Sequence, residues 1–264
     1  MKLGFIGCGN MASAMISGIL KNGVCKAEEV IVSAKTEATL QKAKDKFGVK
    51  TAQSNTEVVQ ASDGFVLAVK PQFYESVIAE IRDSVKPGQM VITIAPGKTL
   101  AWLSEKFGKP VSIIRTMPNT PAMVGEGITA VCCGEDVPQQ TLDDALKILR
   151  SFGKAEIVPE RLMDAVVSVS GSSPAFVFMF IEAMADAAVA DGMPRAQAYT
   201  FAAQAVLGSA KMVLETGKHP AVLKDMVCSP AGTTIEAVRV LEETGFRGSV
   251  MAAMKACTDK AKSV

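Results

Sequence analysis

Few side chains in this sequence are suited to general acid–base catalysis, and that scarcity limits the reactions the chain can perform. It has 264 residues and a single histidine, His219, which precedes a proline and is expected in a turn. Reduction of a ketone by hydride builds up charge on oxygen and usually needs a positioned acid such as His, Lys or Tyr. A protonated cyclic imine already carries its proton, so its reduction needs little beyond binding and alignment. The scarcity of candidate acids in the second half of the chain therefore mildly favours a C=N substrate.

A pair of threonines at a predicted helix start is the candidate substrate site. Thr233-Thr234-Ile235-Glu236 follows Gly232 and can form a capping box, with Thr233 as the cap and Glu236 reaching back to it. That box is the structural alternative for Thr233. It leaves Thr234 in the first helical turn beside free N–H groups, which can hold a carboxylate while the hydroxyl binds a nitrogen.

A glycine turn near the N-terminus predicts a dinucleotide site. An apolar run that begins at residue 2 breaks into Gly-x-Gly-x-x-Ala, which opens a helical pattern. Gly7 permits the sharp bend, Gly9 leaves room for a pyrophosphate, and Ala12 lets the helix pack close to the strand. The start of that helix would face the phosphates. A second strand-like run, residues 29 to 33, completes the context that the motif needs.

The end of that second run bears on the choice of cofactor. An Asp or Glu there would bind the ribose and select NAD, but the sequence reads Ser33-Ala34-Lys35-Thr36. Two hydroxyls, a cation and a helix start suit a 2′-phosphate, so we expect NADPH to be preferred, with NADH possible as a weaker donor. Alternatively, Lys35 is a solvated charge, and Ser33 or Thr36 only caps the helix.

Strand-like and helical patterns alternate as far as Val158 and predict a mostly parallel, doubly wound α/β sheet. The expected strands are residues 2–6, 29–33, 49–51, 64–69, 90–94, 111–114, 128–133 and 155–158. Ligands of such sheets bind outside the carboxyl ends of the strands. We therefore expect cofactor contacts from three loops that follow strands: Val69, Lys70 and Pro71; Ala95; and Pro118 and Asn119.

From Glu160 onward no strand-like run appears, and long helical patterns take over. We expect a Rossmann-type dinucleotide-binding domain over residues 1–159 and an all-helical domain over 160–264. Pro174 should kink or restart the first long helix. Two of the helical faces are too apolar for about a hundred residues to cover, so we expect a homodimer through this domain, with further association possible. These faces carry Phe176, Phe178, Met179, Phe180, Met184 and Ala187, and Phe201, Ala205, Met212 and Val213.

Composition argues against several other partners. Twenty-eight basic and 27 acidic residues leave a net charge of +1, so bulk charge offers no basic face for nucleic acid or an anionic membrane. The six cysteines have no Cys-x-x-Cys spacing, and one histidine cannot complete the usual zinc clusters, so we expect no metal and buried reduced thiols. The longest uncharged stretch, residues 165 to 181, is too short and too polar to span a membrane. We expect a cytoplasmic protein.

Several motifs together resemble those of the pyrroline-5-carboxylate reductase family, over essentially the whole chain. They are Phe5-Ile6-Gly7-Cys8-Gly9-Asn10-Met11-Ala12, Val69-Lys70-Pro71-Gln72, Arg115-Thr116-Met117-Pro118-Asn119-Thr120-Pro121, Ser170-Gly171-Ser172-Ser173-Pro174-Ala175, and Leu223-Lys224-Asp225 through Ser229-Pro230-Ala231-Gly232-Thr233-Thr234-Ile235. The last resembles the family signature. It departs from many members at Ala231, where a second glycine is common, and Ser173 also stands where glycine is common.

The resemblance implies NAD(P)H-dependent reduction of L-1-pyrroline-5-carboxylate to L-proline, the last step of proline biosynthesis. It implies that the cofactor is bound by Gly7, Cys8, Gly9, Asn10, Met11, Ala12, Ser33, Asn55, Val69, Lys70 and the Ala95 loop. It also implies a substrate pocket at a dimer interface, lined by Ser229 and the Gly232–Thr234 loop with Thr234 near the imine nitrogen. Glu160 matches an acidic position near the pocket in some relatives.

Two other functions remain open on the sequence alone. A β-hydroxyacid dehydrogenase also joins a Rossmann domain to a helical one, but it needs a catalytic lysine, for which Lys211 is the only candidate and lacks the surrounding glycine motif. A non-catalytic NADPH-binding regulator would have no use for a hydroxyl at the second helix start.

Overall fold

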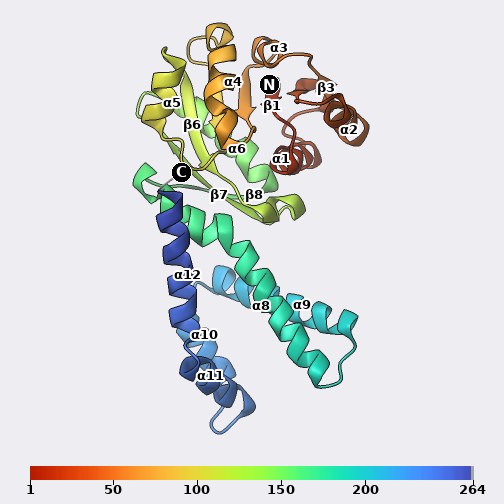
Figure 1. The fold of residues 1–264 in the computed structure, drawn as a ribbon, viewed down its shortest axis with the longest axis vertical. Helices are drawn as coiled ribbons and strands as arrows, with labels where there is room; N and C mark the ends of the chain where they lie inside the picture. Colours follow the sequence, from red (N-terminus) through yellow and green to blue (C-terminus); the bar gives the residue numbers. More distant parts are fainter. Residues whose placement is uncertain (263–264) are drawn as a thin grey trace. The chain divides into compact units, whose positions relative to one another are not determined.

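The computed structural model describes residues 1 to 262, which divide into two compact units (Figure 1). One is Met1–Ser172 with the end of the last helix from Cys257, and the other is Ser173–Ala256. The sequence places a domain boundary earlier, between residues 159 and 160. Residues 160 to 172 remain with the sheet because Met163 is buried against Ala130 and Cys132. The Thr258 hydroxyl, 3.0 Å from that of Ser168, holds the helix end in the same unit.

Within the described residues, eight strands form one sheet in the order β3-β2-β1-β4-β5-β6-β7-β8. They are β1 (Leu3–Ile6), β2 (Val30–Ser33), β3 (Lys50–Thr51), β4 (Gly64–Leu67), β5 (Met90–Thr93), β6 (Ser112–Met117), β7 (Gly127–Cys133) and β8 (Gly153–Ile157). All neighbours pair in parallel except β6 and β7. The predicted mostly parallel α/β sheet is confirmed.

Helices cover both faces of the sheet, which explains the continuous apolar runs of its central strands. On one face α1 (Asn10–Lys21), α2 (Glu37–Phe47) and α6 (Gln139–Leu149) bury side chains against Phe5, Val32 and Ile114. On the other, α3 (Asn55–Ala61), α4 (Tyr74–Ile81) and α5 (Leu100–Phe107) pack on Phe65 and Val91. All four residues of β1, β2, β4 and β5 are buried.

The antiparallel pairing of β6 and β7 was not foreseen from the sequence. Residues 118 to 126 join the two strands and contain one 3₁₀ turn, Thr120–Val124. A parallel partner would need a crossover of a dozen or more residues, so this connection is too short and returns the chain as a hairpin. The hairpin extends β6 to Met117, beyond the predicted end.

Helix starts in this unit are of two kinds. The helices α2, α3 and α5 begin after a hydroxyl residue, Thr36, Ser54 or Thr99, whose oxygen accepts a backbone N–H of the first turn. In contrast, α1 begins after Gly9, and within the described chain no side chain caps it. The first N–H groups of α1 are therefore free to meet a ligand.

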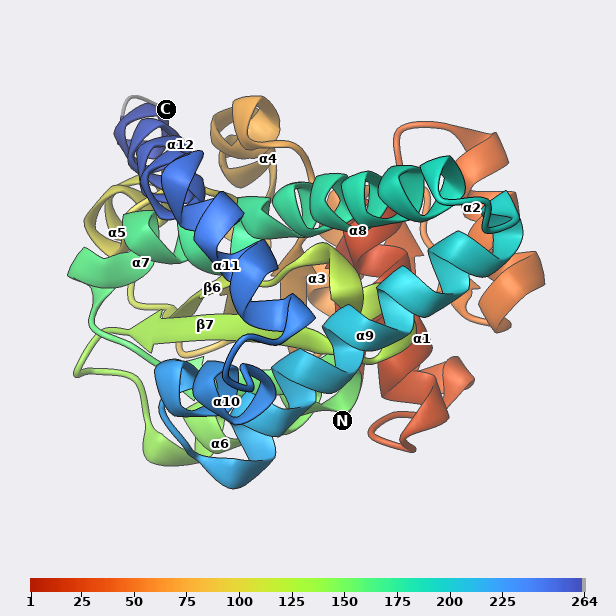
Figure 2. The ribbon, with the colours of Figure 1, turned by 90° about the horizontal axis from the view of Figure 1, so that it is seen from below.

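The second unit contains α8 (Ser173–Ala190), α9 (Arg195–Thr216), α10 (Pro220–Val227), α11 (Thr233–Glu243) and most of α12 (Phe246–Ala261). The helices α8 and α9 pack side by side (Figure 2). Gly217, at φ +62°, ends α9. His219 lies at the start of α10, where its Nδ1 accepts the Ala221 N–H at 3.2 Å. The single histidine thus has a capping role in this structure.

The helix leading into the second unit is interrupted ahead of its proline, as predicted. After α7 (Met163–Val166) the chain widens into a π turn, Val167–Ser172, and α8 begins at Ser173. Pro174 has no N–H, so it cannot donate to the carbonyl of Ser170 four residues earlier. Helical structure nevertheless continues from Glu160 to Ala190, a run long and apolar enough to cross a membrane by length and composition alone. The uncharged stretch of residues 165 to 181 thus lies within a longer helical run that also contains charged residues.

Much of the apolar surface of the second unit is exposed in the single chain. It includes Phe178, Met179 and Phe180 on α8 and Phe201, Leu207, Met212 and Leu214 on α9. Such a surface exceeds the scattered apolar side chains of an ordinary monomer.

Candidate active site

The predicted phosphate turn has the geometry that its glycines require. Gly7 has φ +95°, and a Cβ there would lie 2.9 Å from the carbonyl oxygen of Ala68. A Cβ on Gly9 would meet no atom within 4 Å, so the space beside this backbone is open. Ala12 is buried under the start of α1. The turn thus presents the first N–H groups of α1, those of Asn10 and Met11 included, to an open space that suits an anion.

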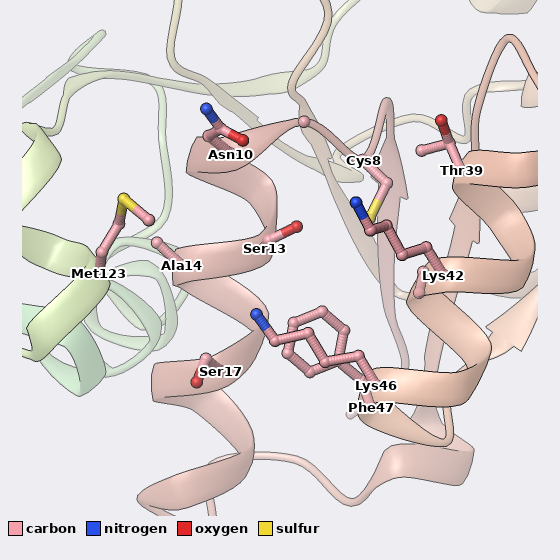
Figure 3. A pocket seen from close by; sticks show the side chains of 12 residues that line it. Cys8, Asn10, Ser13, Ala14, Ser17, Thr39, Lys42, Lys46, Phe47 and Met123 are labelled. Carbon is pink, nitrogen blue, oxygen red and sulfur yellow. The ribbon is translucent and has the colours of Figure 1, made fainter.

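A pocket flanks the turn between α1 and α2 (Figure 3). Cys8 reaches it from the turn and Ser13 from α1, and the exposed Lys42 and Lys46 reach it from α2. Burial raises the pKa of the Cys8 thiol, against the opposing effects of Ser13 and Lys46, so the thiol is protonated near neutral pH. The two lysines, which the sequence did not single out, make the surroundings of the phosphate turn electropositive.

A second pocket, of about 380 Å³, gathers several of the residues predicted to bind the cofactor. Gly7, Ser33, Lys35, Asn55 and Val69 all line it. Its volume lies in the range of small-molecule sites. The five residues come from four separate segments of the chain, which the strand order brings together at one edge of the sheet.

Hydrogen bonds fix the polar wall of this second pocket. The buried Ser33 hydroxyl donates to Asn55 Oδ1 at 2.7 Å, and Asn55 Nδ2 donates to Glu80 Oε2 at 2.8 Å. The Lys35 ammonium lies 5.7 Å from the ring centroid of Phe73 and forms no ion pair with any described residue. Glu80 and Phe73 were missed from the sequence, although Phe73 closely follows the Lys70-Pro71 loop. Lys35 is available to a phosphate.

Thr36 has another task. Its hydroxyl accepts the Thr39 N–H at 3.3 Å and lies 2.8 Å from the Thr39 hydroxyl. Thr36 is therefore the cap of α2, the structural alternative raised above, and it does not line the second pocket.

Tyr74 joins the ends of two central strands and was also missed from the sequence. Its hydroxyl donates to the Leu67 carbonyl at 2.6 Å and accepts the Ile94 N–H at 3.2 Å. Complete burial raises the pKa of the Tyr74 phenol far above its ordinary value, so it stays protonated. These bonds hold the loops that carry Val69 and Ala95.

In the predicted loops after β4, β5 and β6, three residues are buried: Ala95, Pro118 and Asn119. Both ends of the Asn119 amide have internal partners, the Ile128 N–H and the Ser170 carbonyl. In this structure the Asn119 side chain supports the loop and does not face a ligand. Val69, Lys70 and Pro71 are more exposed, with Lys70 preceding the 3₁₀ turn Pro71–Phe73.

Glu160 is tied to the sheet by one of its two carboxylate oxygens. Its Oε1 accepts from the buried Arg115 Nη1 and from the Leu100 N–H, both at 2.7 Å. These bonds link the end of β6 to the start of α5 and neutralise a buried guanidinium. Among the described residues Oε2 has no hydrogen-bond partner, so the predicted contact with substrate stays possible through this oxygen.

In the second unit a tight turn precedes α11. The Gly232 N–H donates to the Ser229 carbonyl at 3.0 Å, and a side chain on Gly232 would overlap the Ser229 hydroxyl. Ala231 has φ +57°, the sole positive φ of a described residue other than glycine. That conformation explains why glycine is common here in the family that the sequence resembles.

The capping box raised as the structural alternative for Thr233 does not form. The helix α11 starts at Thr233 itself, its N-cap is Gly232, and no described side chain caps it. Glu236 instead binds Arg239 at 3.1 Å. Thr233 and Thr234 therefore both lie in the first turn, where the half-buried Thr234 hydroxyl and the free N–H groups can act together.

Comparison with known proteins decides the family. The chain is 52% identical over 263 residues to pyrroline-5-carboxylate reductase of Escherichia coli (strain K12), with 100% of this chain and 98% of the relative covered. The chain belongs to the pyrroline-5-carboxylate reductase family. A reductase of Methanosarcina acetivorans is 43% identical over 263 residues, covering 100% of this chain and 97% of the relative.

Solved structures of the pyrroline-5-carboxylate reductase family have the same fold. The Coxiella burnetii protein matches with a TM-score of 0.92 and 34% identity, over 99% of this chain and 97% of that one. The Plasmodium falciparum protein, solved with NADP bound, matches with a TM-score of 0.89 and 32% identity, over 100% and 97%.

Two protein-family models match separate parts of the chain. "NADP oxidoreductase coenzyme F420-dependent" matches residues 2–97, which contain the phosphate turn and the second pocket. "Pyrroline-5-carboxylate reductase dimerisation" matches residues 160–264. Lys211 is the candidate catalytic lysine of the β-hydroxyacid dehydrogenase alternative. It is exposed, and its Nζ lies 3.5 Å from Oε1 of Glu215 in an ion pair on the surface of α9. That alternative is therefore set aside.

The expectation of buried, reduced cysteines is met only in part. All six cysteines are free, but only Cys25 and Cys132 are buried, which corrects the expectation that all of them would be. Burial raises the pKa of Cys132 to about 12. Within residues 1 to 262 no three His, Cys, Asp or Glu side chains gather to hold a metal.

Proposed function

We infer that the chain reduces L-1-pyrroline-5-carboxylate to L-proline with NAD(P)H, the final step of proline biosynthesis. The observation that carries this conclusion is the 52% identity to a pyrroline-5-carboxylate reductase over the whole chain. The cofactor, when bound, supplies the hydride that the imine carbon receives. The imine nitrogen is already protonated, so the protein has to bind and align the two partners and needs no strong acid.

We propose that the first unit holds NADPH through residues that it brings to one edge of the sheet. The open N–H groups at the start of α1 suit the pyrophosphate, and Ser33, Lys35 and Asn55 suit the ribose and its 2′-phosphate. The absence of an acid after Val32 supports NADPH over NADH, with NADH accepted less well. Val69, Lys70, Pro71 and Ala95 would contact the cofactor from the neighbouring loops, and the loop of Pro118 and Asn119 would border the nicotinamide, the buried residues through their backbone.

We propose that the substrate carboxylate binds at the start of α11. Its free N–H groups, after the turn that contains Ser229 and Gly232, offer several donors to one anion. The Thr234 hydroxyl would bind the ring nitrogen, and Thr233 would contribute from the same turn.

We propose separately that Glu160 of the first unit contacts substrate through Oε2, the oxygen that Arg115 and Leu100 leave free.

We propose a homodimer whose exposed α8 and α9 faces cover one another. The support is the match of residues 160–264 to a dimerisation family and the apolar side chains that the single chain leaves exposed. A second copy, in place of a lipid bilayer, would cover the apolar helix from Glu160 to Ala190. Light scattering at low micromolar concentration should give a dimer or larger; a fully active monomer would refute the proposal.

Free thiols and a metabolic substrate support a cytoplasmic location, which we also propose.

One assay tests the proposed function. Purified protein is mixed with NADPH and L-1-pyrroline-5-carboxylate, and loss of reduced nicotinamide is followed by absorbance. A parallel series supplies NADP⁺ and a panel of 3-hydroxyacids. Turnover with the imine alone is expected. Turnover with hydroxyacids alone would indicate a β-hydroxyacid dehydrogenase, and binding of NADPH without any turnover would indicate a regulator.

A further inference from the structure

The buried Asn119 side chain bridges two segments that are far apart in the sequence. Its Oδ1 accepts the Ile128 N–H at 2.9 Å, and its Nδ2 donates to the Ser170 carbonyl at 3.1 Å. One partner lies near the start of β7, and the other lies in the π turn Val167–Ser172. A neutral amide offers an acceptor and a donor on separate atoms, and these two partners fix its orientation.

The Ser170 carbonyl has a specific need for this donor. In an α-helix it would accept the N–H of residue 174, but that residue is Pro174, which has none. The Ser170 carbonyl is partly buried, and the Asn119 amide gives it a donor at a place where Pro174 has none to offer.

Packing joins the same two segments. A Cβ on Gly171 would lie 2.7 Å from Cε of Met117, so the methionine side chain lies directly on the π turn. Met117 ends β6 and precedes Pro118, one of the residues expected to border the nicotinamide. The loop at this strand end and the π turn therefore form one packed piece, and Asn119 supplies its polar contacts.

We propose that Asn119 is a positioning residue for hydride transfer, which fixes the strand-end loop of residues 118 to 121 to the π turn without touching the cofactor. The proposal rests on the proposed function, because hydride transfer requires the nicotinamide to be held closely in place. Small displacements of reacting groups lower the rate of the chemical step more than they weaken binding. Asn119 therefore affects kcat more than the KM for NADPH.

The test separates the two ends of the amide. Asn119→Asp keeps the acceptor for Ile128 and loses the donor for Ser170, and Asn119→Ala loses both without burying a charge. Pro174→Ala returns an N–H four residues after Ser170, which can replace the missing donor. Asn22→Asp is the matched control, because Asn22 Nδ2 also donates to a distant carbonyl, that of Ser151 at 2.7 Å.

We expect kcat to fall about tenfold in Asn119→Asp and at least as much in Asn119→Ala, with the KM for NADPH changed by less than about twofold. In the Pro174→Ala background, Asn119→Asp should lower kcat by less than about threefold. Asn22→Asp should lower Tm and leave kcat unchanged.

Two results would overturn the proposal. One is a loss of Tm in both Asn119 variants with wild-type kcat, and the other is an Asn119→Asp loss of equal size in both Pro174 backgrounds. If Asn119→Asp does not fold, Asn119→Ala in the two backgrounds gives the same comparison. A wild-type protein without turnover would instead refute the proposed function, which keeps the two failures distinct.

Discussion

The helices α2, α3 and α5 begin under a capping hydroxyl, whereas α1 and α11 begin after a glycine with no cap from a described side chain. At a capped start, the side-chain oxygen of the N-cap residue accepts a hydrogen bond from one of the free backbone N–H groups of the first turn. An uncapped start leaves all of them for a ligand, together with the positive end of the helix dipole. The helices α4, α6 and α9 also lack a side-chain cap among the described residues, but they do not follow a glycine. We take the open starts of α1 and α11, which do, as the anion sites for cofactor and substrate, and the three capped ones as structural.

The two open starts differ in how the chain enters them. At α1 the sharp bend is made by Gly7 at φ +95°, which a glycine adopts freely. At α11 the bend is made by Ala231 at φ +57°, a conformation that costs an alanine about 1–2 kcal/mol. The cofactor turn is thus relaxed, and the predicted substrate turn is strained.

The largest expected effect comes from closing the open start of α1. Gly9→Asp places a carboxylate where it caps the helix and repels phosphate, in a position where a Cβ meets no neighbour. We expect NADPH affinity to fall about a hundredfold or more, ~2.7 kcal/mol, while Tm is not lowered. Titration by cofactor fluorescence and a melting curve measure the two quantities.

Gly9→Ser is the uncharged control for this change and should lose less affinity. Unchanged NADPH binding in Gly9→Asp would mean that α1 is not the phosphate site.

A smaller effect on cofactor binding is expected from Lys35, which lines the second pocket. Lys35 makes no ion pair with a described residue and lies near the aromatic ring of Phe73. A cation beside a phosphate at an exposed site contributes about 1 kcal/mol, so Lys35→Ala should raise the KM for NADPH several-fold and leave that for NADH nearly unchanged. Lys44→Ala, an exposed lysine on α2 that does not line this pocket, is the matched control. Equal losses with both cofactors would remove Lys35 from the 2′-phosphate site.

The smallest effect concerns the strain before α11. Ala231→Gly relieves the left-handed conformation but increases the freedom of the unfolded chain. We expect a net gain of about 0.5–1 kcal/mol, seen as a rise in Tm of about 1–3 °C. If calorimetry shows that Ala231→Gly lowers Tm, the turn before α11 is not strained by its alanine.

Periodicity and turn chemistry were enough to predict the sheet. The runs at β1, β2, β4 and β5 are apolar throughout because helices cover both sides, and Gly48 and Gly108 end their helices at positive φ. The reversal at β7 depends on how the short loop after Met117 folds, and single residues do not reveal that.

The site was predicted in outline, and the assignments of particular hydroxyls were less secure. Thr36 and Thr233 are each a threonine at a helix start, yet the first caps its helix and the second does not. The difference depends on where each helix begins, one residue either way, which a sequence pattern cannot fix. Asn119 and Tyr74 were missed in their roles because their partners lie on other elements and leave no local signal.

The central claim is that the open start of α11 binds substrate, whereas capped starts only stabilise helices. It is tested most directly by removing one threonine hydroxyl at the open start and one that caps a helix. We measure kcat/KM for the imine and Tm in Thr234→Ala and in Thr99→Ala, the latter losing the cap of α5. Thr234→Ala should lower kcat/KM about tenfold to a hundredfold, the effect of one hydrogen bond of about 1.5–3 kcal/mol to a charged group, with Tm and NADPH binding nearly unchanged and much activity restored in Thr234→Ser. Thr99→Ala should lose about 1 kcal/mol of stability and keep its kcat/KM. If Thr234→Ala instead loses Tm and retains wild-type kcat/KM, its hydroxyl is structural and the account is wrong.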